Sequence, residues 1–295
     1  METIQYQGLD CVALENASLS LLVTQSVGPR ILSLRYKGGD NLFAELPNFV
    51  SERPDGKLFH FRGGHRLWHS PEAMPRTYAL DDEPVEITTP AEGGLLVRQK
   101  ADAETGIEKS LHISLVGDQP RVVVRHTLTN RGLWPIECSP WAITQFRTGG
   151  VAILPQSRQE TNMLPNRSLA IWPYVDFASR QVTWGNRYLL IRAEMTGPFK
   201  VGFPNPRGWL AYWLEGTLFV KRAAFDASAA YYDFGSSSEC YCNDKFLELE
   251  TLAPIHRFEP GGSAEHVETW DVYADVDYPA DEDAAQAIAD KLGLE

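Results

Sequence analysis

The sequence predicts an all-β protein built from antiparallel sheets, and three observations support this prediction. Short segments rich in Val, Leu, Tyr, Phe and Trp recur along the chain, and several alternate apolar and polar residues as half-buried strands do. Turn-forming runs such as GGD (38–40), PDG (54–56) and EPGG (259–262) separate them. Helical segments do not alternate with these strands, which argues against a parallel βαβ sheet.

The expected strands, in chain order, are SLSLLVT (18–24), RILSLRY (30–36), GLLVRQKA (94–101), KSLHISLV (109–116), RVVVRHTLTN (121–130), RYLLIRAE (187–194), WLAYWLE (209–215), TLFVKRAAF (217–225), KFLELETL (245–252) and HVETWDVYA (266–274). The stretch 150–186 is irregular and carries three prolines. A loop of that length in a compact protein is often functional. Antiparallel sheets of this extent must close or stack, which leaves one face partly open for chemistry.

A single helix is expected at the end of the chain, over ADEDAAQAIADKLG (280–293). Acidic residues occupy its first turn, Ala, Ile and Leu follow at helical spacing, and Lys291 precedes the stop at Gly293. We expect this helix to pack on the stacked sheets. No linker or strict repeat interrupts the chain, so residues 1–295 are expected to form one domain.

Composition and charge exclude several classes of partner. The chain has 295 residues, of which 43% are hydrophobic, enough for a large core, and its net charge is −12. A surface this acidic repels phosphate backbones and anionic membranes. Neither nucleic acid nor a membrane is therefore an expected partner. The N-terminal METIQYQGLD has no basic or apolar leader, and no apolar run approaches the ~20 residues that span a bilayer.

The four cysteines favour a reduced, cytoplasmic protein with buried free thiols. Cys240 and Cys242 form a C-x-C pair whose side chains share one face of a strand, about 6.5–7 Å apart and at the limit for a disulfide. Two cysteines without a matched second pair do not make a zinc site. No metal is therefore expected.

The densest polar and aromatic cluster is FHFRGGHRLWHSPE (59–72). Its Gly63–Gly64 pair permits positive φ or close backbone approach. Arg and His donate hydrogen bonds and Trp offers a flat apolar face, a combination that suits a sugar ring; the alternative is a structural turn with a cation–π contact and satisfied histidines. The candidate residues here are Arg62, His65, Arg66, Trp68, His69 and Glu72. His65 and His69 have the i, i+4 spacing of a zinc pair, but the segment is not helical and lacks the accompanying Glu.

A second cluster, FLELETLAP (246–254), places Glu248 and Glu250 on one face of a strand about 7 Å apart. Repulsion and burial should raise one of their pKa values, which suits a general acid or base. The alternative is a solvated face paired with Lys or Arg.

Three further residues are candidates for sugar contacts or ion pairs. Trp141 lies in the extended SPWAITQF segment, where a lone Trp is more often a core residue. Lys200 and Lys221 are single lysines in apolar strands, and either could meet the two glutamates or an anionic substrate. Nucleotide-binding and hydrolase motifs (GxGxxG, GxxxxGK[ST], GxSxG) are absent, so no organic cofactor is expected.

Several motifs, in order, resemble the galactose mutarotase-like superfamily. GPRILSLRYKGGDNLF (28–43) is similar to its opening strands, LTNRGLWPIECSPW to a middle strand pair, and FLELETLAP with FEPGGSAEHVETWDVY (258–273) to its closing strands. FRGGHRLW is similar to a segment of the hexose-6-phosphate epimerase branch. GGHRLWHSPE, SPWAITQF and ELETLAP together look like a branch that carries a DUF4380-type domain.

The resemblance implies a β-supersandwich with a short C-terminal helix and a small-molecule carbohydrate site on its concave face. In aldose 1-epimerases of this fold, a late-strand glutamate takes the proton of the anomeric hydroxyl and a histidine protonates the ring oxygen. The glutamate maps onto Glu250, with Glu248 as the neighbour that could exchange roles. The family's histidine maps onto residues 141–146, which contain none, so His65 or His69 could supply the proton from a different strand. We expect His65 to be the acid, and it must then meet Glu250 in one hollow.

Under this hypothesis Trp68 and Trp141 stack on the sugar. The hydroxyl-binding residues are then Arg66, His69, Glu72, Glu248 and Lys221, with Arg62 contributing positive charge. Two other functions stay open: sugar binding without turnover, and a glycoside hydrolase or lyase that uses Glu248 and Glu250. The expected separation of these two carboxylates, ~7 Å, does not exclude an inverting mechanism.

Overall fold

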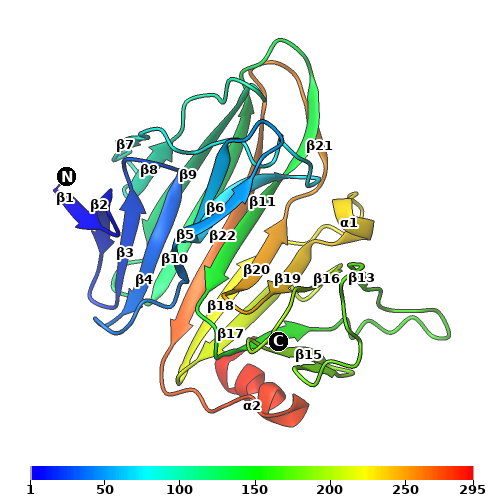
Figure 1. Cartoon of the computed structure of the whole chain (residues 1–295). Coiled ribbons are helices and arrows are strands. Elements are labelled where there is room, and N and C mark those ends of the chain that lie inside the picture. The colour runs from blue at the N-terminus through cyan, green and yellow to red at the C-terminus, as the bar shows by residue number, and fades with distance from the viewer. Residues whose placement is uncertain (1, 295) are drawn as a thin grey trace.

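A computed structural model describes residues 2–294, which fold into two large antiparallel sheets stacked face to face (Figure 1). The first sheet has twelve strands among these residues, ten of them in one hydrogen-bonded path. The path runs β1 (Thr3–Tyr6), β2 (Leu9–Glu15), β3 (Leu19–Thr24), β4 (Arg30–Tyr36), β6 (Leu58–Ser70), β11 (Ile136–Phe146), β20 (Leu247–Leu252), β19 (Ser238–Cys242), β16 (Phe199–Phe203) and β13 (Ala170–Ile171), with β5 (Glu45–Glu52) on β6 and β21 (His256–Phe258) on β11.

The second sheet has ten strands in the same part of the chain. Their order is β14 (Val182–Trp184), β15 (Tyr188–Arg192), β12 (Val151–Pro155), β17 (Trp209–Leu214), β18 (Thr217–Ala223), β22 (Ser263–Tyr273), β10 (Arg121–Asn130), β9 (Ile107–Leu115), β8 (Leu95–Arg98) and β7 (Glu86–Thr88). The predicted all-β, two-sheet architecture is confirmed, and the stretch 150–186 contributes the short strands β12, β13 and β14.

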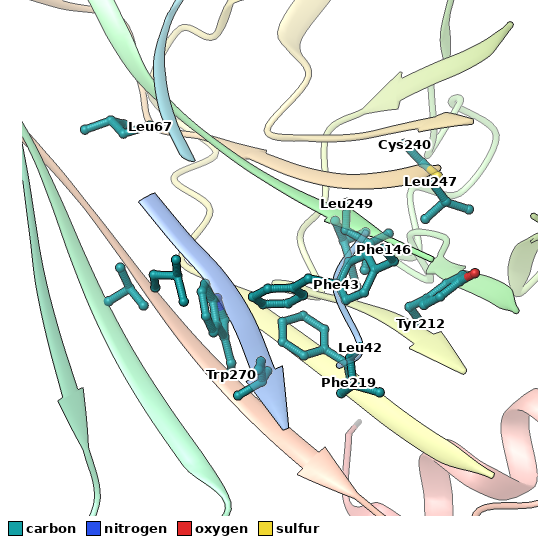
Figure 2. Close-up of a cluster of buried hydrophobic side chains, with 14 of the residues drawn as sticks. Leu42, Phe43, Leu67, Phe146, Tyr212, Phe219, Cys240, Leu247, Leu249 and Trp270 are labelled. Atoms are coloured by element: carbon teal, nitrogen blue, oxygen red, sulfur yellow. The ribbon is translucent and has the colours of Figure 1, made fainter. Parts of the chain in front are cut away.

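The core lies between the two sheets and is built from side chains of alternate strand positions (Figure 2). Phe43 sits at its centre, with ring centroids 5.6 Å from Phe146 and 5.9 Å from Trp270, both edge to face. Aromatic pairs in this arrangement contribute attraction beyond their buried area. Because side chains alternate along a strand, the residues between these core positions point to the opposite face of each sheet.

Strand β6 runs without interruption through the Gly63–Gly64 pair, so this segment is a strand and not the isolated turn considered from the sequence. Both glycines have positive φ, 86° and 72°. A Cβ on Gly63 would lie 1.9 Å from the Ala44 carbonyl oxygen, and one on Gly64 would lie 2.2 Å from that of Ile31. The glycines therefore allow β5 and β4 to pack against successive parts of one long strand.

Helix α2 (Glu282–Leu292) lies at the C-terminal end of the chain, beside β15 (Figure 1). The Asp281 carboxylate accepts hydrogen bonds from the N–H groups of Asp283 and Ala284, and Gly293 ends the helix in the left-handed conformation. These caps confirm the predicted terminal helix. Neither helix in residues 2–294 combines the length and the apolar character that a membrane crossing requires.

All four cysteines are buried free thiols, as the sequence predicts. Cys240 and Cys242 point into the core from β19, and burial raises the pKa of both thiols. They therefore act as small apolar side chains.

Candidate functional site

A hollow of about 250 Å³ opens on the face of the twelve-stranded sheet that points away from the other sheet. Strands β6, β11 and β20 form its floor, and most of its walls are aromatic rings. Its lining residues are Phe49, Phe61, Arg66, Trp68, Glu72, Tyr78, Trp141, Ile143, Tyr174, Pro198, Lys200, Tyr241, Phe246 and Glu248.

Strand register determines which side chains reach this hollow. Arg66 pairs with Ile143, and Ile143 pairs with Glu250 on the other side, so these three residues share one face. Their neighbours His65 and Leu67 point to the opposite face, into the space between the sheets. A shift of one residue along β6 would exchange the two sets.

An ion pair between Arg66 and Glu248 lies at the wall of the hollow. The Arg66 Nη2 donates to Glu248 Oε1 at 3.0 Å, and the guanidinium lies 4.3 Å from the centre of the Trp68 ring. Burial raises the pKa of Glu248 to about 7, against the opposing effect of Arg66. This carboxyl group can therefore take up or release a proton near neutral pH.

A second charged group is centred on Lys200. Its Nζ lies 2.7 Å from Glu239 Oε2 and 3.0 Å from Glu250 Oε2, and it sits 4.7 Å from the centre of the Trp141 ring. Burial lowers the pKa of Lys200, but the two carboxylates outweigh burial and hold the pKa well above its usual range.

Glu250 lies beneath the floor of the hollow and is fully buried. Its Oε2 accepts hydrogen bonds from Trp141 Nε1 at 2.7 Å and from Lys200 Nζ at 3.0 Å. Glu250 thus fixes the orientation of an aromatic ring and a cation that do line the hollow.

Several buried polar atoms around this floor have no hydrogen-bond partner within the described part of the chain. They are the Nε and Nη1 of Arg66, both amide atoms of Gln145, and Oε1 of Glu250. Buried polar groups are normally satisfied, and unsatisfied ones cost free energy. Unsatisfied groups of this kind are typical of a candidate ligand site.

The structure does not bring His65 and Glu250 together, and this corrects the expected acid–base pair. His65 is fully buried between the sheets, where its Nε2 lies 2.7 Å from His126 Nε2 and its Nδ1 lies 2.8 Å from Thr144 Oγ1. Burial lowers the pKa of His65 well below its usual range. His65 is thus on the far side of the sheet from the hollow and cannot reach a ligand there.

Three more sequence candidates also lie outside the hollow. Lys221 is fully buried between the sheets, where its Nζ contacts Glu268 Oε1 at 2.9 Å. Arg62 forms ion pairs with Asp81 and Asp82, and His69 is fully buried on the face that His65 occupies. A basic pocket for an anionic sugar would need Arg62, Arg66, Lys200 and Lys221 to converge. They do not, since only Arg66 and Lys200 reach the hollow.

The hollow does unite Arg66, Trp68, Trp141 and Glu248, and Glu72 lies at its wall, where it accepts a hydrogen bond of 2.5 Å from the Tyr78 hydroxyl. Sequence reasoning missed the remaining aromatic lining residues and Glu239. A signal for some of them was the alternation in SECYC (238–242), which puts Glu239 and Tyr241 on one face and the two cysteines on the other.

One group of side chains has the composition of a metal site. The ligand atoms of His65, His126 and Glu268 lie within 4.8 Å of one another. However, Glu268 already accepts hydrogen bonds from Lys221 Nζ and, at 2.8 Å, from Trp270 Nε1. A buried ammonium beside the carboxylate opposes a cation, so these residues fit a structural network better than a metal centre.

No family model matches the chain, and no curated protein matches it. Solved structures do. A TPR-domain containing protein from Parabacteroides distasonis superposes with a TM-score of 0.62 at 13% identity. The match covers 93% of this chain but only about half (49%) of that protein. A galactose mutarotase-like protein from Lactobacillus casei gives 0.59 at 11% identity, over 89% of this chain and 100% of the other.

A candidate aldose 1-epimerase from Klebsiella pneumoniae gives a TM-score of 0.60 at 11% identity, over 97% of this chain and 83% of the other. The chain therefore has a galactose mutarotase-like fold with a short C-terminal helix, which confirms the predicted fold class. At these identities the likeness concerns the fold alone.

Proposed function

We propose that the hollow binds a neutral aldose and catalyses its 1-epimerisation. The observation that carries the proposal is Glu248, a carboxyl group with a pKa of about 7 in a hollow walled by aromatic rings. Trp68 and Trp141 offer apolar faces to the C–H side of a sugar ring. The unpartnered polar atoms of Arg66 and Gln145 suit its hydroxyl groups. The shared fold with mutarotase-like proteins supports a sugar ligand.

The charge of the site favours a neutral sugar over a phosphorylated or acidic one. Arg66 is paired with Glu248, and Lys200 lies between Glu239 and Glu250. Neither cation is left over to neutralise an anionic substituent. A phosphate group on the sugar would instead lie close to several carboxyl groups, which would repel it.

In the proposed reaction the Glu248 carboxylate takes the proton of the anomeric hydroxyl while the bond between C1 and the ring oxygen breaks. The Lys200 ammonium donates a hydrogen bond and then a proton to the ring oxygen. After rotation about the C1–C2 bond, Lys200 takes the proton back, Glu248 returns its own, and the ring closes on the other face of C1. Such acid–base catalysis contributes about 10²–10⁴-fold in rate.

Glu250 and His65 thus have other roles than the family resemblance implied. Glu250 is a positioning residue, because it holds Trp141 and Lys200. A hydrolase that uses Glu248 and Glu250 together is less well supported, since Glu250 lies beneath the floor and does not face a scissile bond. Membership of the branch with a DUF4380-type domain is part of this proposal and rests on GGHRLWHSPE, SPWAITQF and ELETLAP.

The test is the equilibration of freshly dissolved α-glucose, α-galactose and other common aldoses, followed by NMR. We expect faster anomer exchange than in buffer, and a loss of at least ~10²-fold for Glu248→Gln. Glu265→Gln is the matched control, because this exposed glutamate on β22 forms an ion pair with Arg125 and does not line the hollow. If no aldose equilibrates faster than in buffer, the epimerase proposal fails; sugar binding that survives in Glu248→Gln would then favour a binding protein.

A further inference from the structure

A second, smaller hollow of about 190 Å³ adjoins the one described above. It is lined by Ala170, Ile171, Trp172, Pro173, Asp233 and Phe234. Two segments far apart in the sequence form it: the end of β13 with the residues that follow, and the short turn α1 (Tyr232–Gly235). Neither segment takes part in the proposed proton transfers.

The two hollows share a wall. The Lys200 Nζ lies 4.7 Å from the centre of the Trp141 ring, in the first hollow, and 4.8 Å from that of Trp172, in the second. Tyr174 lines the first hollow, two residues after Trp172. A ligand that fills the first hollow can therefore continue over Trp172 into the second.

The backbone at the edge of the second hollow has a strained conformation and carries an exposed aromatic ring. Asp233 (φ 50°, ψ 52°) and Phe234 (φ 58°, ψ 34°) both adopt the left-handed conformation, and Phe234 is 96% exposed. Ser236 holds the turn, because its N–H donates to the Tyr232 carbonyl at 3.0 Å and its hydroxyl to that of Asp233 at 2.7 Å. For a bulky residue this conformation is unfavourable, and strain of this kind concentrates at ligand sites.

We propose that this second hollow binds the neighbouring sugar ring of a neutral disaccharide whose reducing ring occupies the first hollow. This rests on the proposed function and narrows its substrate class. Phe234 and Trp172 supply apolar faces for the second ring, and the Asp233 carboxyl group accepts from its hydroxyls. A neutral ring fits because Asp233 and Glu239 lie close to each other, and a further negative charge there would be repelled.

The experiment compares disaccharides with their own monosaccharide, using cellobiose, maltose and lactose beside glucose. Calorimetric titration gives the dissociation constants, and polarimetry of fresh anomers gives KM and kcat. We expect Phe234→Ala to weaken disaccharide binding relative to glucose about tenfold, as the loss of one stacking surface implies. Trp134→Ala is the control, because Trp134 is also an exposed aromatic residue, at 77%, but lines neither hollow.

The outcomes separate the two proposals. If glucose is turned over but Phe234→Ala leaves the ratio of disaccharide to glucose affinity unchanged, the second sugar site is refuted and the epimerase proposal stands. If nothing is turned over, yet a disaccharide binds more tightly than glucose and Phe234→Ala removes the difference, the second site stands and the epimerase proposal fails. Failure of all four sugars to bind overturns the second site, and it overturns both proposals if, in addition, no other aldose equilibrates faster than in buffer.

Discussion

Replacing Lys221 by Met tests whether this lysine stabilises the fold rather than binding substrate. Its Nζ lies 2.9 Å from Glu268 Oε1, 3.0 Å from the Leu249 carbonyl oxygen and 3.3 Å from that of Ala142. All of these groups lie between the sheets. Removing the ammonium leaves a buried carboxylate without its cation, which costs about 3–5 kcal/mol of unfolding free energy.

The double variant Lys221→Met/Glu268→Gln isolates the charge effect. It removes the carboxylate that would otherwise lack its cation. The remaining loss of unfolding free energy comes from the two hydrogen bonds to backbone carbonyls, about 1 kcal/mol each or about 2 kcal/mol together. We expect the double variant to be more stable than Lys221→Met alone. Urea unfolding followed by tryptophan fluorescence at pH 8 measures both values; this pH keeps His126, 4.0 Å from Glu268, from taking a compensating proton.

Two results would refute this reasoning. A loss below about 1 kcal/mol for Lys221→Met would mean that the carboxylate does not need its cation. A double variant no more stable than the single one would mean that the loss comes from packing alone.

Three further predictions concern proton binding and close packing. Burial holds the pKa of His266 at about 3, below the value of ~6.5 in the unfolded chain. The contribution of the neutral His266 to the unfolding free energy is therefore present above pH 6.5 and lost as the pH falls. Between pH 6.5 and 5, urea unfolding should show wild type losing about 2 kcal/mol more than His266→Asn; equal losses would contradict this. Because the proposed base must be ionised, kcat/KM should rise with pH through about 7, the pKa of Glu248, and a flat profile would exclude it. Gly63→Ala should lower the unfolding free energy by more than about 2 kcal/mol, while Gly197→Ala, whose Cβ meets nothing within 4 Å, should change it by less than about 0.5 kcal/mol; similar losses would show that the close approach to Ala44 is not limiting.

Local patterns predicted the strands and the terminal helix because those patterns record burial along one element. RILSLRY and RVVVRHTLTN match β4 and β10 in both bounds, and the helix expected over 280–293 is α2 with its caps. The Gly63–Gly64 pair was harder to interpret. It suggests a turn, whereas the contacts that need glycine come from Ala44, just before β5, and from Ile31 on β4.

The site was predicted only in part, because strand alternation gives relative faces and not absolute ones. The sequence already places His65 and Arg66 on opposite faces of one strand. Which face is open depends on the register between β6, β11 and β20, and that register is set by contacts between segments far apart in the sequence, such as Arg66 with Ile143 and Ile143 with Glu250. The expected pairing of His65 with Glu250 required both to share a face, and the observed register puts Arg66 there instead.

The polar groups on the two faces of these central strands differ in one respect that separates structure from function. Between the sheets, His126 Nδ1–H donates to the His266 carbonyl oxygen at 2.9 Å, so its Nε2 accepts from His65 Nε2–H, and His65 Nδ1 accepts from the Thr144 hydroxyl. Each of these bonds is consistent with neutral histidines, and no ligand is needed to complete the chain.

The polar groups on the outer face differ from this histidine chain. Arg66, Gln145 and Glu250 keep buried polar atoms without a protein partner, although the aromatic walls around them exclude much of the solvent. A fold tolerates such groups where a ligand completes their hydrogen bonds. The same strands thus use polar residues for stability on one side and, under the proposed function, for sugar recognition on the other. Both ring nitrogens of His69, on the face that His65 occupies, also lack a partner in the described residues, so the contrast holds for the chain of His65, His126 and His266 and not for that whole face.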